Sequence, residues 1–368
     1  NRIPKTSQSN KETKRNTKDR KARTHKQKSK YGAANNLCRR TKQLRNKDAP
    51  LLIRPRLDYR MWKWIFKFLL HTISGSHIRN TTETIRMGLA SRKLYDEICK
   101  EETIEHNMFD RSDCGILHFY KTESYWKNAN SVKDMYNANG CKWDLLTDEG
   151  VKEIEPTLEK IPAIIGGTWT EDDWVGDIHK FTYHLAFILK EKYNVTFFYN
   201  WPIHDIDQIS DYDKIIIANG VGSTDLAKTV GDTLDVYPVK GYSITINNVN
   251  PKHLPKTSLL DDEAKIVTSS LGNKFRVAGT AELAGENYDI RRDRIQPLLD
   301  WVHLNFPDIN THDYTQWACL RPMTPNMMPI LKQSKKNPKV YYNTGHGHLG
   351  WTLGPFTAQK ICKIAGLL

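Results

Sequence analysis

A glycine-rich loop near the end of the sequence has the residue types and spacing that most favour chemistry. The run "NTGHGHLGWT" (343–352) places Gly345, Gly347 and Gly350 in the order G-x-G-x-x-G, between an expected strand and an expected helix. A Rossmann dinucleotide site also needs a second parallel strand and an acidic residue about 20 positions further on. Only 18 residues follow Gly350, and none of them is acidic. The loop is therefore not predicted to be a Rossmann fingerprint.

The same loop can still contact a flat ligand. Small residues let the backbone approach such a ligand closely, and the free amides at the start of a helix favour negative charge. A reduced flavin develops negative charge on its pyrimidine edge, so this arrangement suits a flavin. A tight structural turn is the alternative. His346 and His348 lie two residues apart without further ligands at suitable spacing, so metal binding is not predicted.

Two more stretches hold small or charged residues next to expected strands. In "IIIANGVGS" (215–223), Ala218, Asn219 and Gly220 could let the ADP part of a cofactor lie at the carboxyl edge of a sheet. An ordinary strand-to-helix turn is the simpler interpretation. In "WACLRPMTPNMMPI" (317–330), Arg321 stands before a proline-rich turn and could bind a carboxylate, although a salt bridge or a surface position is equally common.

Tyr242 follows Gly241 in "PVKGYSITI" (238–246). Its hydroxyl could bind a substrate, but packing within the sheet is the more common role of such a residue. Nucleophile signatures such as G-x-S-x-G are absent from the sequence.

The elements that must position these residues follow from periodicity and turn signals. We expect strands at 114–120, 195–199, 214–218 and 339–343, an antiparallel meander over 234–286, and helices over 58–70, 81–106, 176–194 and 291–305 and from about 355. The continuous apolar run at 214–218 predicts a strand buried on both faces of a parallel sheet. Asp177 is expected to cap its helix.

Helix 58–70 has an unusual composition, with aromatic residues such as Trp62 and Phe66 interleaved with Lys63 and Lys67. This composition is typical of a helix at a membrane interface. A core helix that is covered on all sides is the simpler interpretation.

Parallel and antiparallel blocks alternate along the chain, which predicts domains built from discontinuous segments. The predicted fold class is α/β plus α+β, an incomplete Rossmann-like domain packed on a mainly antiparallel-sheet substrate domain. The predicted segments are a disordered basic tail (1–47), a helical and mixed substrate-domain segment (48–165), a cofactor-domain segment (166–233), an antiparallel substrate-domain segment (234–320) and a C-terminal cofactor-domain segment (321–368).

Charge is distributed very unevenly over the 368 residues, which carry a formal net charge of +13. Residues 1–50 hold 17 Lys and Arg against three acidic residues, whereas the remaining 318 hold 38 against 39. The basic excess is thus a property of the tail, and a nucleic-acid partner is not expected. No apolar run is long enough to span a membrane, and no secretory signal is recognisable. Six scattered cysteines predict reduced thiols in a cytoplasmic protein.

Six stretches together resemble one known family. They are "APLLIRPRLD" (49–58), "GDIHKFT" (176–182), "YPVKGYSITI" (237–246), "RVAGTAELAG" (276–285), "LRPMTPN" (320–326) and "NTGHGHLGWT" (343–352). In content and order they resemble the bacterial D-amino acid dehydrogenase small subunits, within the FAD-dependent D-amino acid oxidase-like superfamily.

The resemblance implies oxidative deamination of D-amino acids, typically D-alanine, to 2-oxo acids and ammonia by hydride transfer to FAD. It implies Arg321, Tyr242 and His346 as catalytic candidates, with Arg321 binding the substrate carboxylate and Tyr242 facing the substrate. The residues it implies along the flavin are Gly345, His346, Gly347, His348, Leu349, Gly350, Trp351 and Thr352. Together with Ala218, Asn219 and Gly220 at the end of the strand 214–218, they are the candidates for FAD binding. Glycine or sarcosine oxidation is the alternative within the superfamily.

The resemblance also implies a membrane-linked electron acceptor, a quinone or the respiratory chain, and a cytoplasmic location. Peripheral contact with the inner face of the membrane would use residues 58–70.

One departure from the family concerns the pyrophosphate of FAD. The family opens with a strand, a G-x-G-x-x-G turn and a helix, but residues 1–47 contain a single glycine, Gly32. We interpret this stretch as a degraded or out-of-frame replacement, which predicts weak or absent FAD binding. A non-catalytic remnant whose basic tail binds nucleic acid or anionic membrane is the alternative from another class.

Overall fold

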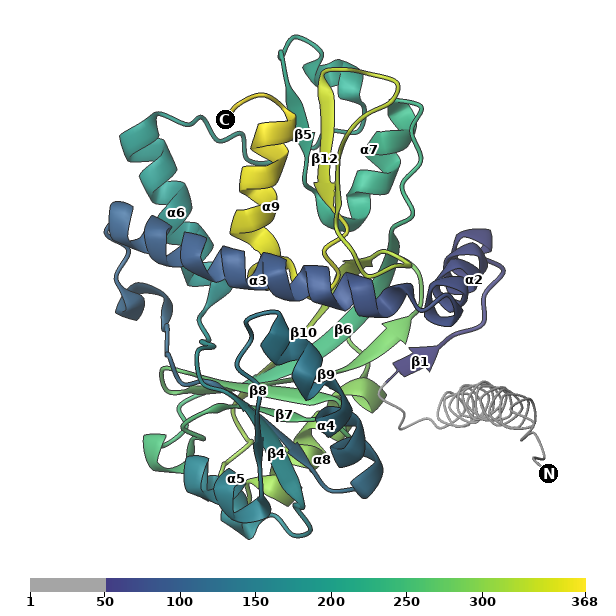
Figure 1. Cartoon of the computed structure of the whole chain (residues 1–368). Coiled ribbons are helices and arrows are strands. Elements are labelled where there is room, and N and C mark those ends of the chain that lie inside the picture. Colours follow the sequence, from purple (N-terminus) through teal and green to yellow (C-terminus); the bar gives the residue numbers. More distant parts are fainter. Residues whose placement is uncertain (1–50) are drawn as a thin grey trace, which may run out of the picture. The chain divides into compact units, whose positions relative to one another are not determined.

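The computed structural model describes residues 51–368, so the predicted tail at 1–47 lies outside the described residues (Figure 1). Residues Ile53–Leu368 form one compact unit. The strands are β1 (Leu51–Ile53), β2 (Ile116–Tyr120), β3 (Asp144–Leu146), β4 (Gly166–Thr170), β5 (Ile215–Ile217), β6 (Tyr237–Ile246), β7 (Ser258–Asp261), β8 (Ile266–Leu271), β9 (Lys274–Leu283), β10 (Tyr314–Met323), β11 (Ile330–Gln333) and β12 (Val340–Thr344). The helices are α2 (Tyr59–Ile73), α3 (Ser76–Glu101), α4 (Glu123–Ala138), α5 (Asp148–Ile154), α6 (Ile178–Tyr193), α7 (Ser223–Thr229), α8 (Arg292–Asn305) and α9 (Gly350–Ile364).

The large sheet has the strand order β10-β6-β9-β8-β7-β2-β4-β3. The antiparallel meander predicted for 234–286 is confirmed, because β6 pairs with β9, β9 with β8 and β8 with β7, all antiparallel. Alternate side chains of these strands, such as Ile244 and Val277, pack in one core cluster with Leu298 of α8. β4 opens the segment predicted for 166–233 but lies in this sheet.

The small sheet has the order β11-β12-β5, and β12 runs parallel to β5. This parallel pair confirms the strand predicted at 214–218, but its predicted burial on both faces is wrong. Ile216 is 37% exposed, whereas its neighbour Tyr341 packs against Ile361 of α9. Paired residues of neighbouring strands share one face of the sheet, so α9 covers this face at Tyr341 and leaves it open at Ile216.

The predicted helix at 176–194 is confirmed as α6, and the Asp177 carboxylate accepts hydrogen bonds from the amides of His179 and Lys180. The strand predicted at 195–199 is wrong, because these residues form an irregular segment without strand partners. Alternating apolar residues form a strand only beside a neighbour that satisfies their backbone groups.

The long helix α3 crosses between the two sheets in Figure 1 and packs against α9. α9 begins at Gly350, earlier than the predicted start near Pro355, which lies inside the helix. A proline leaves the carbonyl four residues before it without its helical donor. Here that carbonyl, of Trp351, accepts the Tyr95 hydroxyl at 2.7 Å. α3 thus compensates for the proline.

α2 is confirmed as a helix, with the Asp58 side chain as its N-cap. The expectation that it is covered on all sides is wrong, because Trp62 is 49% and Phe66 62% exposed. No helix within residues 51–368 is long and apolar enough to cross a membrane.

Candidate active site

The two small-residue segments predicted from the sequence lie side by side at the carboxyl edge of the small sheet. The Ser223 hydroxyl donates to the Thr344 hydroxyl at 2.9 Å, and the Thr344 hydroxyl donates to the Gly220 carbonyl at 3.0 Å. These contacts fix the end of β5 against the end of β12. Ala218 and Asn219 are exposed there, and the space where a Cβ of Gly220 would stand is open. The edge is therefore accessible to a ligand.

The glycine loop is tied to the end of β10, directly after Arg321. The Gly347 amide donates to the Pro322 carbonyl at 2.9 Å, and His346 forms an isolated bridge with Met323. Gly347 has φ +60°, and a Cβ there would lie 2.6 Å from the Met323 sulfur. Glycine is required by both the backbone conformation and the close approach.

Arg321 is a half-buried cation that has no anionic partner among residues 51–368. It makes no hydrogen bond or ion pair with any residue in 51–368, and a Cβ on Gly241 would lie 2.4 Å from its guanidinium carbon. Burial lowers the pKa of Arg321, and the positive charge of Arg276 lowers it further. A guanidinium that is desolvated and unpaired in this way is suited to binding an external carboxylate.

Of the two histidines in the glycine loop, His346 lies close to α9 and His348 lies close to Arg321. Burial lowers the pKa of His346, whose Nε2 lies 3.0 Å from the Thr357 hydroxyl. His348 reaches solvent at the loop, yet the surrounding protein lowers its pKa, and the charge of Arg321 lowers it further. Both imidazoles are thereby held neutral near pH 7.

A cavity of about 570 Å³ lies between α3 and the segment 348–352. His348, Leu349, Trp351 and Thr352 contribute to its lining, together with Trp174 and residues of α3. Leu349, the N-cap of α9, makes no side-chain capping bond, so the first amides of α9 lack a cap. The free amides at the start of a helix favour negative charge.

Trp351 has a second role beside this cavity. Its ring lies 4.6 Å from Tyr95 and 5.2 Å from Phe181, measured between ring centroids. This aromatic cluster joins α9 to α3 and α6. Trp351 is thus a packing residue as well as a cavity residue.

Among the described residues, no hydrogen bond or ion pair joins the Tyr242 side chain to Arg321 or to the glycine loop. Its side chain is 1% exposed and packs in the core with Ile244, and its hydroxyl donates to the Glu282 carboxylate at 2.5 Å. Burial and this carboxylate raise the pKa of Tyr242. The predicted substrate contact of Tyr242 stays a prediction.

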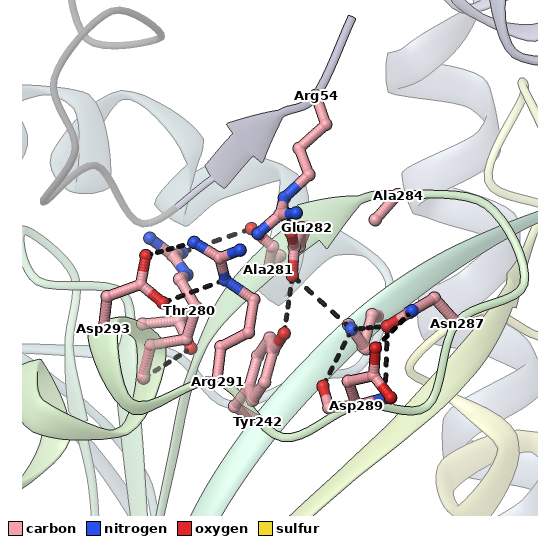
Figure 2. A network of polar contacts seen from close by, with 12 residues as sticks. Arg54, Tyr242, Thr280, Ala281, Glu282, Ala284, Asn287, Asp289, Arg291 and Asp293 are labelled. Atoms are coloured by element: carbon pink, nitrogen blue, oxygen red, sulfur yellow. Dashed lines mark hydrogen bonds and ion pairs between the residues drawn. The ribbon is translucent and has the colours of Figure 1, made fainter. Parts of the chain in front are cut away.

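Glu282 is the centre of a buried ionic network that also includes Arg54 and Lys240 (Figure 2). The Lys240 ammonium lies 3.7 Å from the carboxylate and donates to the Asn287 side chain at 2.6 Å. Lys240 and Tyr242 flank Gly241 in β6, so alternation directs them away from the face of Gly241, where Arg321 lies. The network thus holds β6, the strand whose Gly241 lies against the Arg321 guanidinium.

Sequence reasoning missed this network and also Arg276. A signal was present for the network, because a lysine within the apolar strand "YPVKGYSITI" requires a buried acid, and "RVAGTAEL" supplies one. No comparable signal marked Arg276, whose guanidinium stacks over Trp317 at 5.3 Å.

The donor set at the sheet edge fits a dinucleotide cofactor better than a metal ion. No cluster of three or more His, Cys, Asp or Glu in the described part of the chain could hold a metal. The buried Asn343 side-chain oxygen, one residue before Thr344, lacks a hydrogen-bond partner among these residues. Polar groups without partners, open glycines and uncapped amides are what a flavin cofactor would use.

Comparison with known proteins agrees with this chemistry. The family described as FAD dependent oxidoreductase matches residues 51–364. "D-amino acid dehydrogenase 3" of Mesorhizobium japonicum is 39% identical over 342 residues, which cover 88% of this chain and 81% of that protein. A D-amino acid dehydrogenase of Paramagnetospirillum magneticum is 35% identical and covers 85% and 76% of the two chains.

Solved structures share the fold. Glycine oxidase from Geobacillus kaustophilus superposes with a TM-score of 0.68 at 20% identity, covering 76% of this chain and 78% of that one. L-alpha-glycerophosphate oxidase from Mycoplasma pneumoniae with FAD bound gives 0.61 at 20% identity, covering 70% and 74%. At these identities the likeness shows the fold alone, whereas the sequence match extends over most of the chain. The chain therefore belongs to the family of FAD-dependent oxidoreductases.

Proposed function

We propose that this protein oxidises D-amino acids to 2-oxo acids and ammonia with FAD as the cofactor. The half-buried guanidinium of Arg321 beside the glycine loop carries the proposal, since an amino acid brings the carboxylate that this cation lacks among the described residues. The names of the relatives, which are D-amino acid dehydrogenases at 39% and 35% identity, support the choice of substrate.

Arg321 binds the substrate carboxylate in this proposal. Because the guanidinium is already desolvated and stacked on Gly241, little reorganisation is required when the carboxylate arrives. A bidentate pair fixes the orientation of the α-carbon as well as its position. Binding at this point places the α-carbon near the glycine loop, because Gly347 is bonded to the residue after Arg321.

The neutral histidines keep the site from holding a second positive charge beside Arg321. A protonated His348 would repel the guanidinium of Arg321. The surrounding protein and the charge of Arg321 both lower the pKa of His348. The substrate amine reacts in its neutral form, so a site without further cations is also suited to receiving it. His346, which is bonded to Thr357, holds the loop against α9.

FAD would supply the two-electron acceptor for oxidation of the substrate α-carbon, and hydrolysis of the resulting imino acid would give the 2-oxo acid and ammonia. The residues proposed to hold it are those at the carboxyl edge of β5, Ala218, Asn219 and Gly220, and those of the loop from Gly345 to Thr352. Positioning and electrostatics are the protein's contribution, so a strong general base is not required.

Finer parts of the proposal rest on the family resemblance. D-alanine is the preferred substrate, the electrons pass to a membrane-linked acceptor such as a quinone, and the protein works in the cytoplasm at the inner face of the membrane. Tyr242 would contact the substrate only if its hydroxyl left Glu282, so this contact has the least support.

FAD binding is proposed to be weak. Residues 1–50 contain no G-x-G-x-x-G turn, and the loop at 345–350 lacks the acidic residue of a complete fingerprint. Assays therefore need FAD in excess.

The test is dye-linked turnover of the purified full chain with excess FAD and D-alanine, glycine or sarcosine. The proposal expects dye reduction and ammonia release with D-alanine above the other two substrates. A preference for glycine or sarcosine would replace the substrate assignment. Absence of turnover with all three, when FAD is shown to be bound, would indicate a non-catalytic protein.

A further inference from the structure

We infer that Arg276 forms a second carboxylate subsite, so that the protein accepts D-amino acids with an acidic side chain, such as D-glutamate. The inference rests on the proposed function, because it names a further substrate class for the same site. The observation that carries it is a second half-buried guanidinium, on the same sheet face as Arg321, that makes no hydrogen bond or ion pair within residues 51–368.

The two arginines share one face of the large sheet. β10, which carries Arg321, pairs with β6, and β6 pairs with β9, which carries Arg276 (Figure 1). Val277 and its partner Ile244 lie in the core cluster, so the preceding Arg276 points to the opposite face. Gly241 lies three residues before Ile244 and belongs to this opposite face, where the Arg321 guanidinium lies against it.

Trp317 lies between the two cations. It stands four residues before Arg321 on β10, so its side chain points to the same face. The guanidinium of Arg276 lies over its ring, 5.3 Å from the centroid, and the ring is 49% exposed. The charge of Arg276 lowers the pKa of Arg321, as expected of two neighbouring cations. A ligand with two carboxylates would relieve this repulsion.

The described part of the chain provides Arg276 with only a weak counter-charge. Burial lowers the pKa of Arg276, and the negative charge of Asp177 offsets this effect only in part. The Asp177 carboxylate accepts the amides of His179 and Lys180 as the cap of α6, and it forms no ion pair with Arg276. The guanidinium donors of Arg276 are therefore available to a ligand.

Ser243 adds a polar group to the same face. It follows Gly241 by two residues and is paired with Trp317 in the register of β6 and β10. Its side chain is 1% exposed, and its hydroxyl lacks a hydrogen-bond partner among the described residues. A buried polar atom of this kind calls for a ligand or an ordered water. This face thus carries a guanidinium on either side of Trp317 and a hydroxyl without a partner.

The arrangement favours an acidic side chain over its amide. With the α-carboxylate at Arg321, a side-chain carboxylate directed along this face meets Arg276 and forms a charge-assisted pair. The amide of D-glutamine has the same size but leaves the charge of Arg276 unbalanced, so the site discriminates against it. D-glutamate and D-glutamine are therefore the pair of substrates that tests the subsite.

The experiment compares kcat/KM for D-glutamate and D-glutamine by dye reduction, using the full chain with excess FAD. The unchanged protein is expected to prefer D-glutamate. Arg276→Leu should lower the ratio of the two values at least about tenfold, because a charge-assisted hydrogen bond is lost, and Arg276→Lys should retain part of the preference. Lys274→Leu is the matched control, since it removes an exposed positive charge from the same strand and should leave the ratio unchanged.

A binding measurement separates this inference from the proposed oxidation. Calorimetric titration of the FAD-loaded chain with glutarate and with pentanoate, a monocarboxylate of the same chain length, requires no turnover. Glutarate is expected to bind more tightly, and Arg276→Leu should remove the difference. If no D-amino acid were oxidised but this difference were found, the subsite would stand and the proposed oxidation would be wrong.

Two outcomes would overturn the inference. The first is equal kcat/KM for D-glutamate and D-glutamine together with equal binding of glutarate and pentanoate. The second is a loss of kcat/KM for D-alanine in Arg276→Leu as large as the loss for D-glutamate, because Arg276 would then bind the α-carboxylate together with Arg321. Circular dichroism of each variant verifies that the fold is retained.

Discussion

Arg321 is the residue on which the chemical proposal depends most directly, because residues 51–368 desolvate its guanidinium without supplying an acid. We propose that the carboxylate of the substrate pairs with the Arg321 guanidinium. Arg321→Leu should lower kcat/KM for D-alanine at least about a hundredfold, since a bidentate charge-assisted pair contributes about 3 kcal/mol. Steady-state dye reduction with excess FAD measures this effect.

The control is Arg291→Leu, which removes an arginine already paired with Asp293 at the surface. Its kinetics should equal those of the unchanged protein. If Arg321→Leu kept full activity while remaining folded, the carboxylate would have to bind elsewhere, and Arg276 would be the next candidate.

His346 gives the protein a dependence on pH that can be stated with its sign. Burial lowers the pKa of His346 in the folded state below its ordinary value of 6.5. As the pH falls through 6.5, the imidazole takes up a proton in the unfolded chain but not yet in the folded protein. The free energy of unfolding therefore decreases from that pH downward, until the pKa of His346 in the folded state is passed. His346→Gln should retain more of its stability between pH 7.5 and pH 5 than the unchanged protein does.

Urea unfolding at the two pH values measures that difference. His312→Gln, on an exposed loop, provides the matched control. An equal loss of stability in the unchanged protein and in His346→Gln would show that the imidazole is not held neutral by its surroundings.

At the scale of elements, the glycine loop is fixed by both conformation and space. Gly347→Ala must place a Cβ against the Met323 sulfur with φ near +60°. Gly272 has a similar φ, but a Cβ there would lie 3.8 Å from the nearest atom, an Asp110 carboxylate oxygen. The backbone penalty alone is roughly 1–2 kcal/mol. Gly347→Ala should therefore lose about 1 kcal/mol more unfolding free energy than Gly272→Ala in urea titrations. Equal losses would mean that the loop can move away from β10.

The ionic network beneath Arg321 belongs to the same scale, since it joins β6 to β9. Glu282→Leu should lower the unfolding free energy by about 3–5 kcal/mol, because it leaves the buried Lys240 ammonium without its carboxylate. The double variant Lys240→Met, Glu282→Leu should be more stable than Glu282→Leu alone, since no unpaired charge is then buried. A double variant less stable than the single variant would show that the network does not act as a charge pair.

The elements differ in how far the sequence predicts them. Local signals were sufficient for α6, where the Asp177 cap and the apolar spacing agree, and for the parallel strand β5. They failed at 195–199, where the residues suit a strand but have no strand to pair with. They also placed the start of α9 too late. The Tyr95 hydroxyl, far away in the sequence, donates to the Trp351 carbonyl that Pro355 leaves without its helical donor. Tertiary contacts decided both cases.

The site residues also divide into those that local sequence signals predict and those that tertiary contacts decide. The glycine loop, the end of β5 and Arg321 carry local signatures, and the fold brings the first two together through Ser223 and Thr344. The environment of Tyr242 could not be predicted in this way, because the direction of a strand side chain depends on which face of the sheet is the core.

At the scale of the whole molecule, a basic tail precedes a body whose charges nearly cancel, and the body belongs to the FAD-dependent oxidoreductases. The proposed weak binding of FAD has to be measured on all 368 residues.

The most direct test of the central claim is anaerobic reduction of the flavin. The full chain is equilibrated with excess FAD under conditions in which binding has been verified, and the visible absorption of the flavin is followed after addition of D-alanine or L-alanine. The account predicts that D-alanine bleaches the bound flavin, that L-alanine does not, and that Arg321→Leu abolishes the difference. Bound flavin that stays oxidised with D-alanine and other D-amino acids would contradict it.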